Sequence, residues 1–106
     1  MKMLIGGKEA DASNGAVYQN INPATGAVID TVPAATPQDL ETVISNAVEG
    51  QKEWAAIPFF KRMEILEKFV QLAQQNEERI ARTMSIEGGK PYAQALGEVG
   101  RVKDAF

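Results

Sequence analysis

Residues 36–55, TPQDLETVISNAVEGQKEWA, lie where the chain changes from short extended segments to long helices. Thr36 offers a hydroxyl N-cap, Pro37 suits the first helical position, and Asp39 places an acid at the third. Apolar residues then recur every three or four positions on one face, namely Leu40, Val43, Ile44, Ala47, Val48, Trp54 and Ala55. The stretch therefore predicts an amphipathic helix that begins at Thr36.

Further helices are predicted downstream by the same periodicity. Pro58 ends the first helix and can open the next, and Gly88 and Gly89 stop the third. No stop signal follows Phe106, the last residue of the final apolar stripe, so we expect the chain to be a piece of a longer one. The predicted helical region, 36–106, contains Thr36–Ile57, Pro58–Gln75, Asn76–Glu87 and Pro91–Phe106.

Residues 1–35 are predicted to form β-strands and hairpins. Apolar or β-branched runs occur at Met3–Ile5, Ala16–Ile21 and Ala27–Val32. Gly6-Gly7 and the five residues from Asn22 to Gly26 have turn composition. The predicted class is therefore α+β: an N-terminal hairpin region followed by three or four amphipathic helices, in a single incomplete domain.

Composition excludes several kinds of chemistry. The 106 residues contain no cysteine and no histidine, so the chain offers no thiolate nucleophile, no Cys-ligated zinc and no imidazole base. The net charge of −3 argues against nucleic-acid binding. No apolar run is long enough for a secretory leader or a membrane span, so we expect a cytoplasmic protein without membrane partners.

Two motifs have ordinary structural interpretations. Gly88-Gly89-Lys90 lacks the earlier glycine and the following Ser or Thr of a phosphate loop, so a helix C-terminus is the favoured interpretation. The aromatic residues Trp54, Phe59 and Phe69 lie at helical spacing and are expected in the core, whereas Phe60 is the better candidate for an exposed contact.

Glu98 is the acid with the most open interpretation. It lies between Gly97 and Gly100, which permit close backbone approach. Its carboxylate could pair with Arg101, face carbonyl oxygens around a metal ion, or simply be exposed to solvent.

The order of several segments resembles the opening of the NAD(P)-dependent aldehyde dehydrogenases. The matching segments are Asn22-Pro23-Ala24-Thr25-Gly26, Ile29 to Pro33, Thr36 to Leu40, Trp54 before Pro58, Arg62 to Leu72, Glu87-Gly88-Gly89-Lys90-Pro91, and Gly97-Glu98-Val99. The resemblance covers roughly residues 3 to 106. No single motif decides the matter, but the ordered series is fairly specific.

The resemblance implies that this chain is the N-terminal segment of a much longer enzyme. That enzyme would have an α/β Rossmann-like cofactor domain to which this segment belongs, a catalytic domain, and a segment that joins subunits into a homo-oligomer. It would oxidise an aldehyde to a carboxylic acid with NAD or NADP, using a cysteine nucleophile and a glutamate that activates water. No catalytic or cofactor-binding residue is carried over to these 106 residues, so we expect them to be inactive alone and to bind no dinucleotide.

The resemblance also implies a candidate site for sodium or potassium. Its ligands would be the backbone carbonyls of Asn20 and Ile21 and the carboxylate of Glu98, and oxygen donors suit a hard cation. The family often has aspartate where this chain has Glu98, and the longer side chain can alter the geometry. We expect such an ion to bind weakly, or not at all, to these residues alone.

One alternative stays open from the sequence. The chain could be a complete, non-enzymatic helical module whose apolar stripes recruit a partner protein. A piece of an enzyme would instead expose the stripes of its last helices and self-associate. Light scattering would separate a defined complex from open-ended association.

Overall fold

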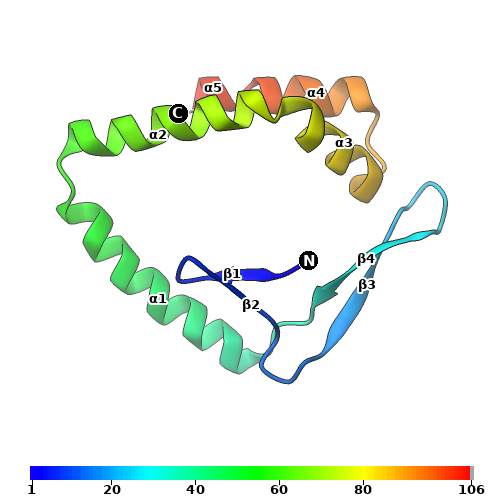
Figure 1. Ribbon diagram of the computed structural model, residues 1–106, viewed down its shortest axis with the longest axis horizontal. Helices are drawn as coiled ribbons and strands as arrows, with labels where there is room; N and C mark the ends of the chain where they lie inside the picture. Colours follow the sequence, from blue (N-terminus) through cyan, green and yellow to red (C-terminus); the bar gives the residue numbers. More distant parts are fainter. Residues whose placement is uncertain (106) are drawn as a thin grey trace. The chain divides into compact units, whose positions relative to one another are not determined.

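A computed structural model describes residues 1–105, apart from the side chains of Lys103 and Ala105. Strands come first and helices follow, as the colour change along the chain in Figure 1 shows. The predicted α+β class is confirmed. The elements are β1 (Met3–Ile5), β2 (Lys8–Ala10), β3 (Val17–Ile21), β4 (Val28–Pro33), α1 (Pro37–Ala56), α2 (Phe59–Gln75), α3 (Glu77–Gly88), α4 (Tyr92–Gly100) and α5 (Val102–Ala105).

The first hairpin joins β1 and β2 through the predicted glycine turn. The strands are antiparallel, with Leu4 opposite Glu9 at the centre of the register. Gly6 and Gly7 both have positive φ, at 56° and 75°, which is the backbone of the two-residue turns that match the twist of a hairpin. A side chain at Gly6 would also collide with Asn46 of α1, so this turn lies directly against that helix.

The second hairpin joins β3 and β4 through the predicted loop from Asn22 to Gly26. The Asn22 side-chain oxygen accepts hydrogen bonds from the backbone N–H groups of Ala24 and Thr25, at 2.9 and 3.3 Å. Gly26 has a φ of 71° and donates its N–H to the Asn22 carbonyl at 2.8 Å. The loop is thus held by its own asparagine, as its composition predicts.

Helix α1 begins with a complete capping box. The Thr36 hydroxyl accepts the Asp39 N–H at 3.2 Å, and the Asp39 carboxylate accepts the Thr36 N–H at 2.8 Å. Asp39 is only 8% exposed and also accepts the Ser13 N–H at 3.2 Å. This acid therefore ties the start of α1 to the segment after β2.

The chain divides into two compact units. Unit 1 consists of residues 1–20 and 28–57, and unit 2 consists of residues 21–27 and the helices from Pro58 onward. The boundary predicted from composition, between residues 35 and 36, separates strands from helices, whereas unit 1 combines strands with α1. That these residues form one incomplete domain stays a prediction.

The core of unit 2 lies between α3 and α4. Small side chains let the two helices approach closely, because Ala81 and Ala95 are both fully buried. Val99 is 5% exposed and packs with them, and Ile80, Met84 and Leu96 border this cluster. Leu96 and Val99, in the middle of the apolar stripe predicted for the last helix, are therefore covered, contrary to the expectation that this stripe would be bare, whereas Tyr92 of the same stripe is 38% exposed.

The single last helix predicted over Pro91–Phe106 is wrong in one respect. Helix α4 ends at Gly100, Arg101 forms its C-cap, and α5 starts at Val102. The break follows Gly100, and apolar spacing alone does not reveal it. Phe106 itself lies outside the described residues.

The core positions predicted for Phe59 and Phe69 are also wrong for this chain. Phe59 is 70% exposed and Phe69 is 49% exposed, whereas the exposure expected of Phe60 is confirmed. An amphipathic helix buries its apolar face only where another element covers it. The same exposure occurs along the apolar stripe of α1, at Leu40, Val43, Ile44 and Val48.

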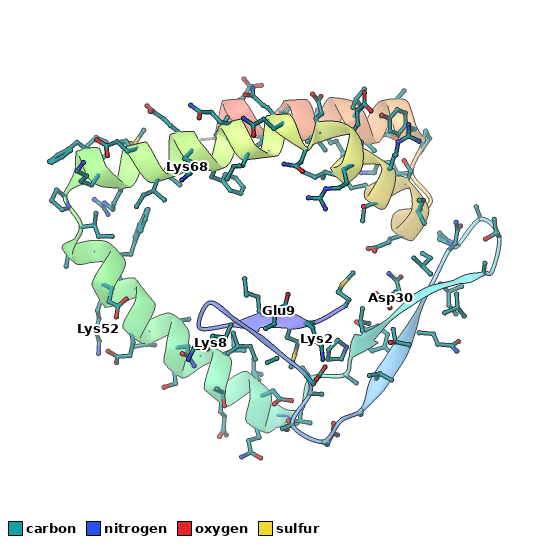
Figure 2. All side chains as sticks on the ribbon, viewed as in Figure 1. Lys2, Lys8, Glu9, Asp30, Lys52 and Lys68 are labelled. Carbon is teal, nitrogen blue, oxygen red and sulfur yellow. The ribbon has the colours of Figure 1, made fainter. Side chains whose placement is uncertain are left out.

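Charged side chains are spread over the elements. The labelled residues of Figure 2 include Lys8 and Glu9 in β2, Lys52 in α1 and Lys68 in α2. Lys52 pairs with Glu49 on the surface of α1 at 2.8 Å.

Within the described part of the chain, no helix combines the length and apolar character needed to cross a membrane.

Candidate functional site

The corner between α3 and α4 carries the residues that sequence reasoning singled out. Gly89 follows α3 with a φ of 67° and donates its N–H to the Ser85 carbonyl at 3.0 Å. The helix C-terminus predicted for Gly88-Gly89-Lys90 is thus confirmed, and its cap is left-handed. Pro91 then opens α4, so the backbone of Lys90 is held between the end of one helix and the start of the next.

Lys90 forms an ion pair with Glu98 across this corner. The Lys90 Nζ donates a hydrogen bond to Glu98 Oε2 at 2.5 Å. The side chains are 33% and 30% exposed, the most protected of the ion pairs found among the described residues. A charge-assisted bond in a partly desolvated place is stronger than a surface pair.

The electrostatic environment keeps Glu98 ionised. The hydrogen bond from Lys90 is the largest influence, and it lowers the pKa of the carboxyl below its ordinary value of 4.5. Partial burial acts in the opposite direction, while the charges of Lys90 and Arg101 lower the pKa further. The partner considered from the sequence, Arg101, thus contributes to the field, but the direct bond comes from Lys90.

Two of the residues predicted to hold a cation, Asn20 and Ile21, are consecutive in β3, and the third, Glu98, lies in α4. Carbonyl and carboxylate oxygens have the right chemistry for a hard cation. The Glu98 carboxylate, however, already holds the Lys90 ammonium. The site at Asn20, Ile21 and Glu98 stays a prediction, and the Lys90 ammonium at Glu98 speaks against a second cation there.

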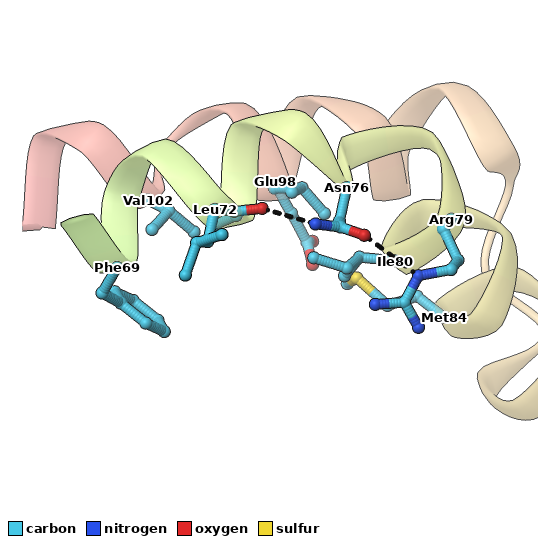
Figure 3. A pocket seen from close by; sticks show the side chains of 10 residues that line it. Phe69, Leu72, Asn76, Arg79, Ile80, Met84, Glu98 and Val102 are labelled. Carbon is cyan, nitrogen blue, oxygen red and sulfur yellow. Dashed lines mark hydrogen bonds between the residues drawn. The ribbon is translucent and has the colours of Figure 1, made fainter.

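A pocket of about 560 Å³ opens beside Glu98 in unit 2. Figure 3 shows Asn76 at its side, donating to the Leu72 carbonyl at 2.8 Å and accepting from Arg79 Nε at 3.3 Å. The apolar lining comes from α2 to α5 and consists of Phe69, Leu72, Ala73, Ile80, Met84, Val99 and Val102.

This pocket offers apolar contact but little chemistry. Its acid, Glu98, is neutralised by Lys90, and the chain has no cysteine or histidine to place beside it. Among the described residues, no three acidic side chains lie close enough together to hold a metal ion. The arrangement therefore suits the packing of an apolar segment rather than acid–base or nucleophilic catalysis.

Sequence reasoning missed the Lys90–Glu98 pair. The two residues are eight positions apart, which is not a spacing that places side chains together on one helix. The signal that could have found it is the Gly-Lys-Pro corner, because a helix C-cap followed by proline turns the chain and leaves Lys90 facing the new helix.

Comparison with known proteins identifies the family. The model of the aldehyde dehydrogenase family matches residues 10–106. This chain belongs to the aldehyde dehydrogenase family. The match favours the resemblance seen in the sequence over the alternative of a helical interaction module.

Aldehyde dehydrogenases of several kinds resemble this chain. It is 38% identical to malonate-semialdehyde dehydrogenase from Halalkalibacterium halodurans over 95% of its own length. It is 40% identical to 3,6-anhydro-alpha-L-galactose dehydrogenase from a Vibrio species over 92%. The chain spans about a fifth of these relatives, 21% and 20%.

Solved structures of aldehyde dehydrogenases share the backbone. The NADP-dependent glyceraldehyde-3-phosphate dehydrogenase from Bacillus halodurans, complexed with NADP, superposes with a TM-score of 0.92 at 27% identity. That alignment covers 97% of this chain and 22% of the dehydrogenase.

Proposed function

We propose that these residues are the N-terminal segment of an NAD(P)-dependent aldehyde dehydrogenase that oxidises an aldehyde to a carboxylic acid. The observation that carries the proposal is the family match over residues 10–106, in a chain about a fifth as long as its relatives. The relatives named above are dehydrogenases, and one related structure is complexed with NADP. These names support a nicotinamide cofactor for the parent enzyme.

The role we assign to the segment is that of a scaffold. In the proposed reaction the nucleophile would be a cysteine thiolate, the nicotinamide would accept the hydride of the aldehyde carbon, and water would release the acid. The sequence has no cysteine, so its own side chains do not supply that nucleophile. The apolar pocket between α2 and α5 and the exposed stripe of α1 support contact with other parts of the parent.

The assay compares two proteins under the same conditions. The longer gene product that contains residues 1–106 is expected to form reduced nicotinamide when supplied with an aldehyde and NAD or NADP. The 106-residue chain alone is expected to form none. Malonate semialdehyde and 3,6-anhydro-L-galactose are suitable first substrates, because relatives act on substrates of those names. Activity of the short chain, or inactivity of the longer product with a broad aldehyde panel, would refute the proposal.

Association belongs to the same proposal. The parent is expected to form a homo-oligomer, and the isolated chain is expected to self-associate through its exposed apolar stripes. Light scattering coupled to size-exclusion chromatography measures both. A cytoplasmic location for the parent stays a prediction, which cell fractionation would test.

A further inference from the structure

The Glu98 carboxylate contacts one positive charge of the chain, that of Lys90, and is influenced by a second. Lys90 Nζ lies 2.5 Å from Glu98 Oε2, and the charge of Arg101 also acts on the same carboxyl. Both members of the ion pair are about two-thirds buried. The acid therefore has a counter-ion without any contribution from solution.

The backbone of Lys90 is restricted by its neighbours in the chain. Gly89 is left-handed, and a side chain added there would lie 2.9 Å from the Pro23 ring, so Gly89 is in close contact with that loop. Pro91 restricts the backbone on the other side. Both neighbours thus constrain the backbone of Lys90, from which its side chain reaches Glu98.

We propose that the Lys90 ammonium takes the place of a metal cation at Glu98, so that this acid needs no sodium or potassium ion. The inference rests on the proposed function, because the expected metal comes from the aldehyde dehydrogenase resemblance. A metal ion on the same carboxylate would lie beside the ammonium, and like charges within about 4–6 Å disfavour each other. Lysine is suited to this role because its ammonium is a compact point charge.

Exchange of the cation in solution tests the proposal. Melting temperatures of the 106-residue chain are compared in sodium, potassium and choline chloride at equal ionic strength. We expect the wild type to melt at one temperature in all three salts. Lys90→Met should melt about 2–5 °C lower in choline. Sodium or potassium should restore part of that loss by binding the bare carboxylate. The double variant Lys90→Met/Glu98→Gln should lose this recovery.

Three results would overturn the proposal. One is a melting temperature of the wild type that rises in sodium or potassium, while that of Glu98→Gln does not. Another is a Lys90→Met chain that melts like the wild type. The third is a Lys90→Met chain destabilised equally in all three salts, because its Glu98 would then have no capacity for a metal that the ammonium could replace.

A second measurement, made on the wild type, tests the proposal if the Lys90→Met chain does not fold. In the wild type, the ammonium nitrogen resonance of Lys90 should differ from those of Lys52 and Lys61, whose ion pairs are exposed, and should not move as sodium is titrated. A Lys90 signal that matches theirs, or that shifts with sodium, contradicts the inference. Neither readout involves aldehyde oxidation, so a failure of this proposal can be distinguished from a failure of the proposed enzymatic function.

Discussion

The contact between Gly89 and Pro23 permits a test that separates two effects of an added side chain: steric overlap and an unfavourable backbone conformation. Gly89→Ala meets two obstacles: a φ of 67°, and a new Cβ that would lie 2.9 Å from Pro23 Cγ. Gly26→Ala meets only the first, because Gly26 has a φ of 71° and nothing within 4 Å of the added atom. Both glycines belong to unit 2, so the second variant is a matched control.

The expected magnitudes follow from these two terms. A left-handed backbone costs a residue with a Cβ about 1–2 kcal/mol. Forcing an extra methyl group into a filled space typically costs a further 1–3 kcal/mol or so. Gly89→Ala should therefore lower the free energy of unfolding by about 2–5 kcal/mol, and Gly26→Ala by about 1–2 kcal/mol.

Urea titration followed by the helical circular dichroism signal measures the difference between the variants. A double-mutant cycle with Pro23→Ala then isolates the contact, because removing the proline ring should relieve part of the damage from Gly89→Ala and none of that from Gly26→Ala. Equal losses for the two glycine variants, or no coupling between Gly89→Ala and Pro23→Ala, would show that Pro23 does not restrict the space at Gly89.

Three other outcomes are expected. Thr36→Ala should destabilise the chain by about 1 kcal/mol in urea titration, whereas Thr36→Ser should retain most of the stability because it keeps the capping oxygen. Hydrogen bonds, first from the Thr36 N–H, lower the pKa of Asp39 below 3.8, so its stabilisation is present above that value and is lost as the pH falls through the folded-state pKa. Asp39→Asn should remove this part of the acid sensitivity in thermal melts at descending pH. Ile44→Lys should weaken self-association roughly tenfold in light scattering, whereas Ser45→Lys, which adds the same charge beside the stripe, should weaken it much less.

The start of α1 was predictable because the determining interactions lie within four residues. The sequence indicates a capped helix through Thr36, Pro37 and Asp39, and the capping box forms between Thr36 and Asp39. The corner at Gly89 was predictable for the same reason, since a left-handed C-cap depends on one residue and its immediate neighbours. Local hydrogen bonding thus links these sequence patterns directly to backbone geometry.

Burial and long-range pairing were not predictable in this way. The pattern at Phe59 and Phe69 correctly indicates amphipathic helices, but periodicity cannot tell whether a covering element is present. The partner of Glu98 depends on the direction of the chain after Gly89, so helical spacing pointed to Arg101 instead of Lys90. The sequence therefore drew attention to Glu98 but not to Lys90, its ion-pair partner.

The distribution of satisfied groups indicates how this segment would contribute to the proposed parent. Three of its polar arrangements have their partners within the segment, namely the capping box at Asp39, the asparagine turn at Asn22 and the Lys90–Glu98 pair. The apolar faces of the segment are incompletely covered, since Ile44 of α1 is 55% exposed and Phe69 of α2 is 49% exposed. Fully covering one such side chain is worth about 1.5–3 kcal/mol, so a few of them together rival the 5–15 kcal/mol or so that stabilises an ordinary domain. Local hydrogen bonds would thus set the backbone geometry of this segment, while most of its stability in the parent would come from burial against the rest of the enzyme.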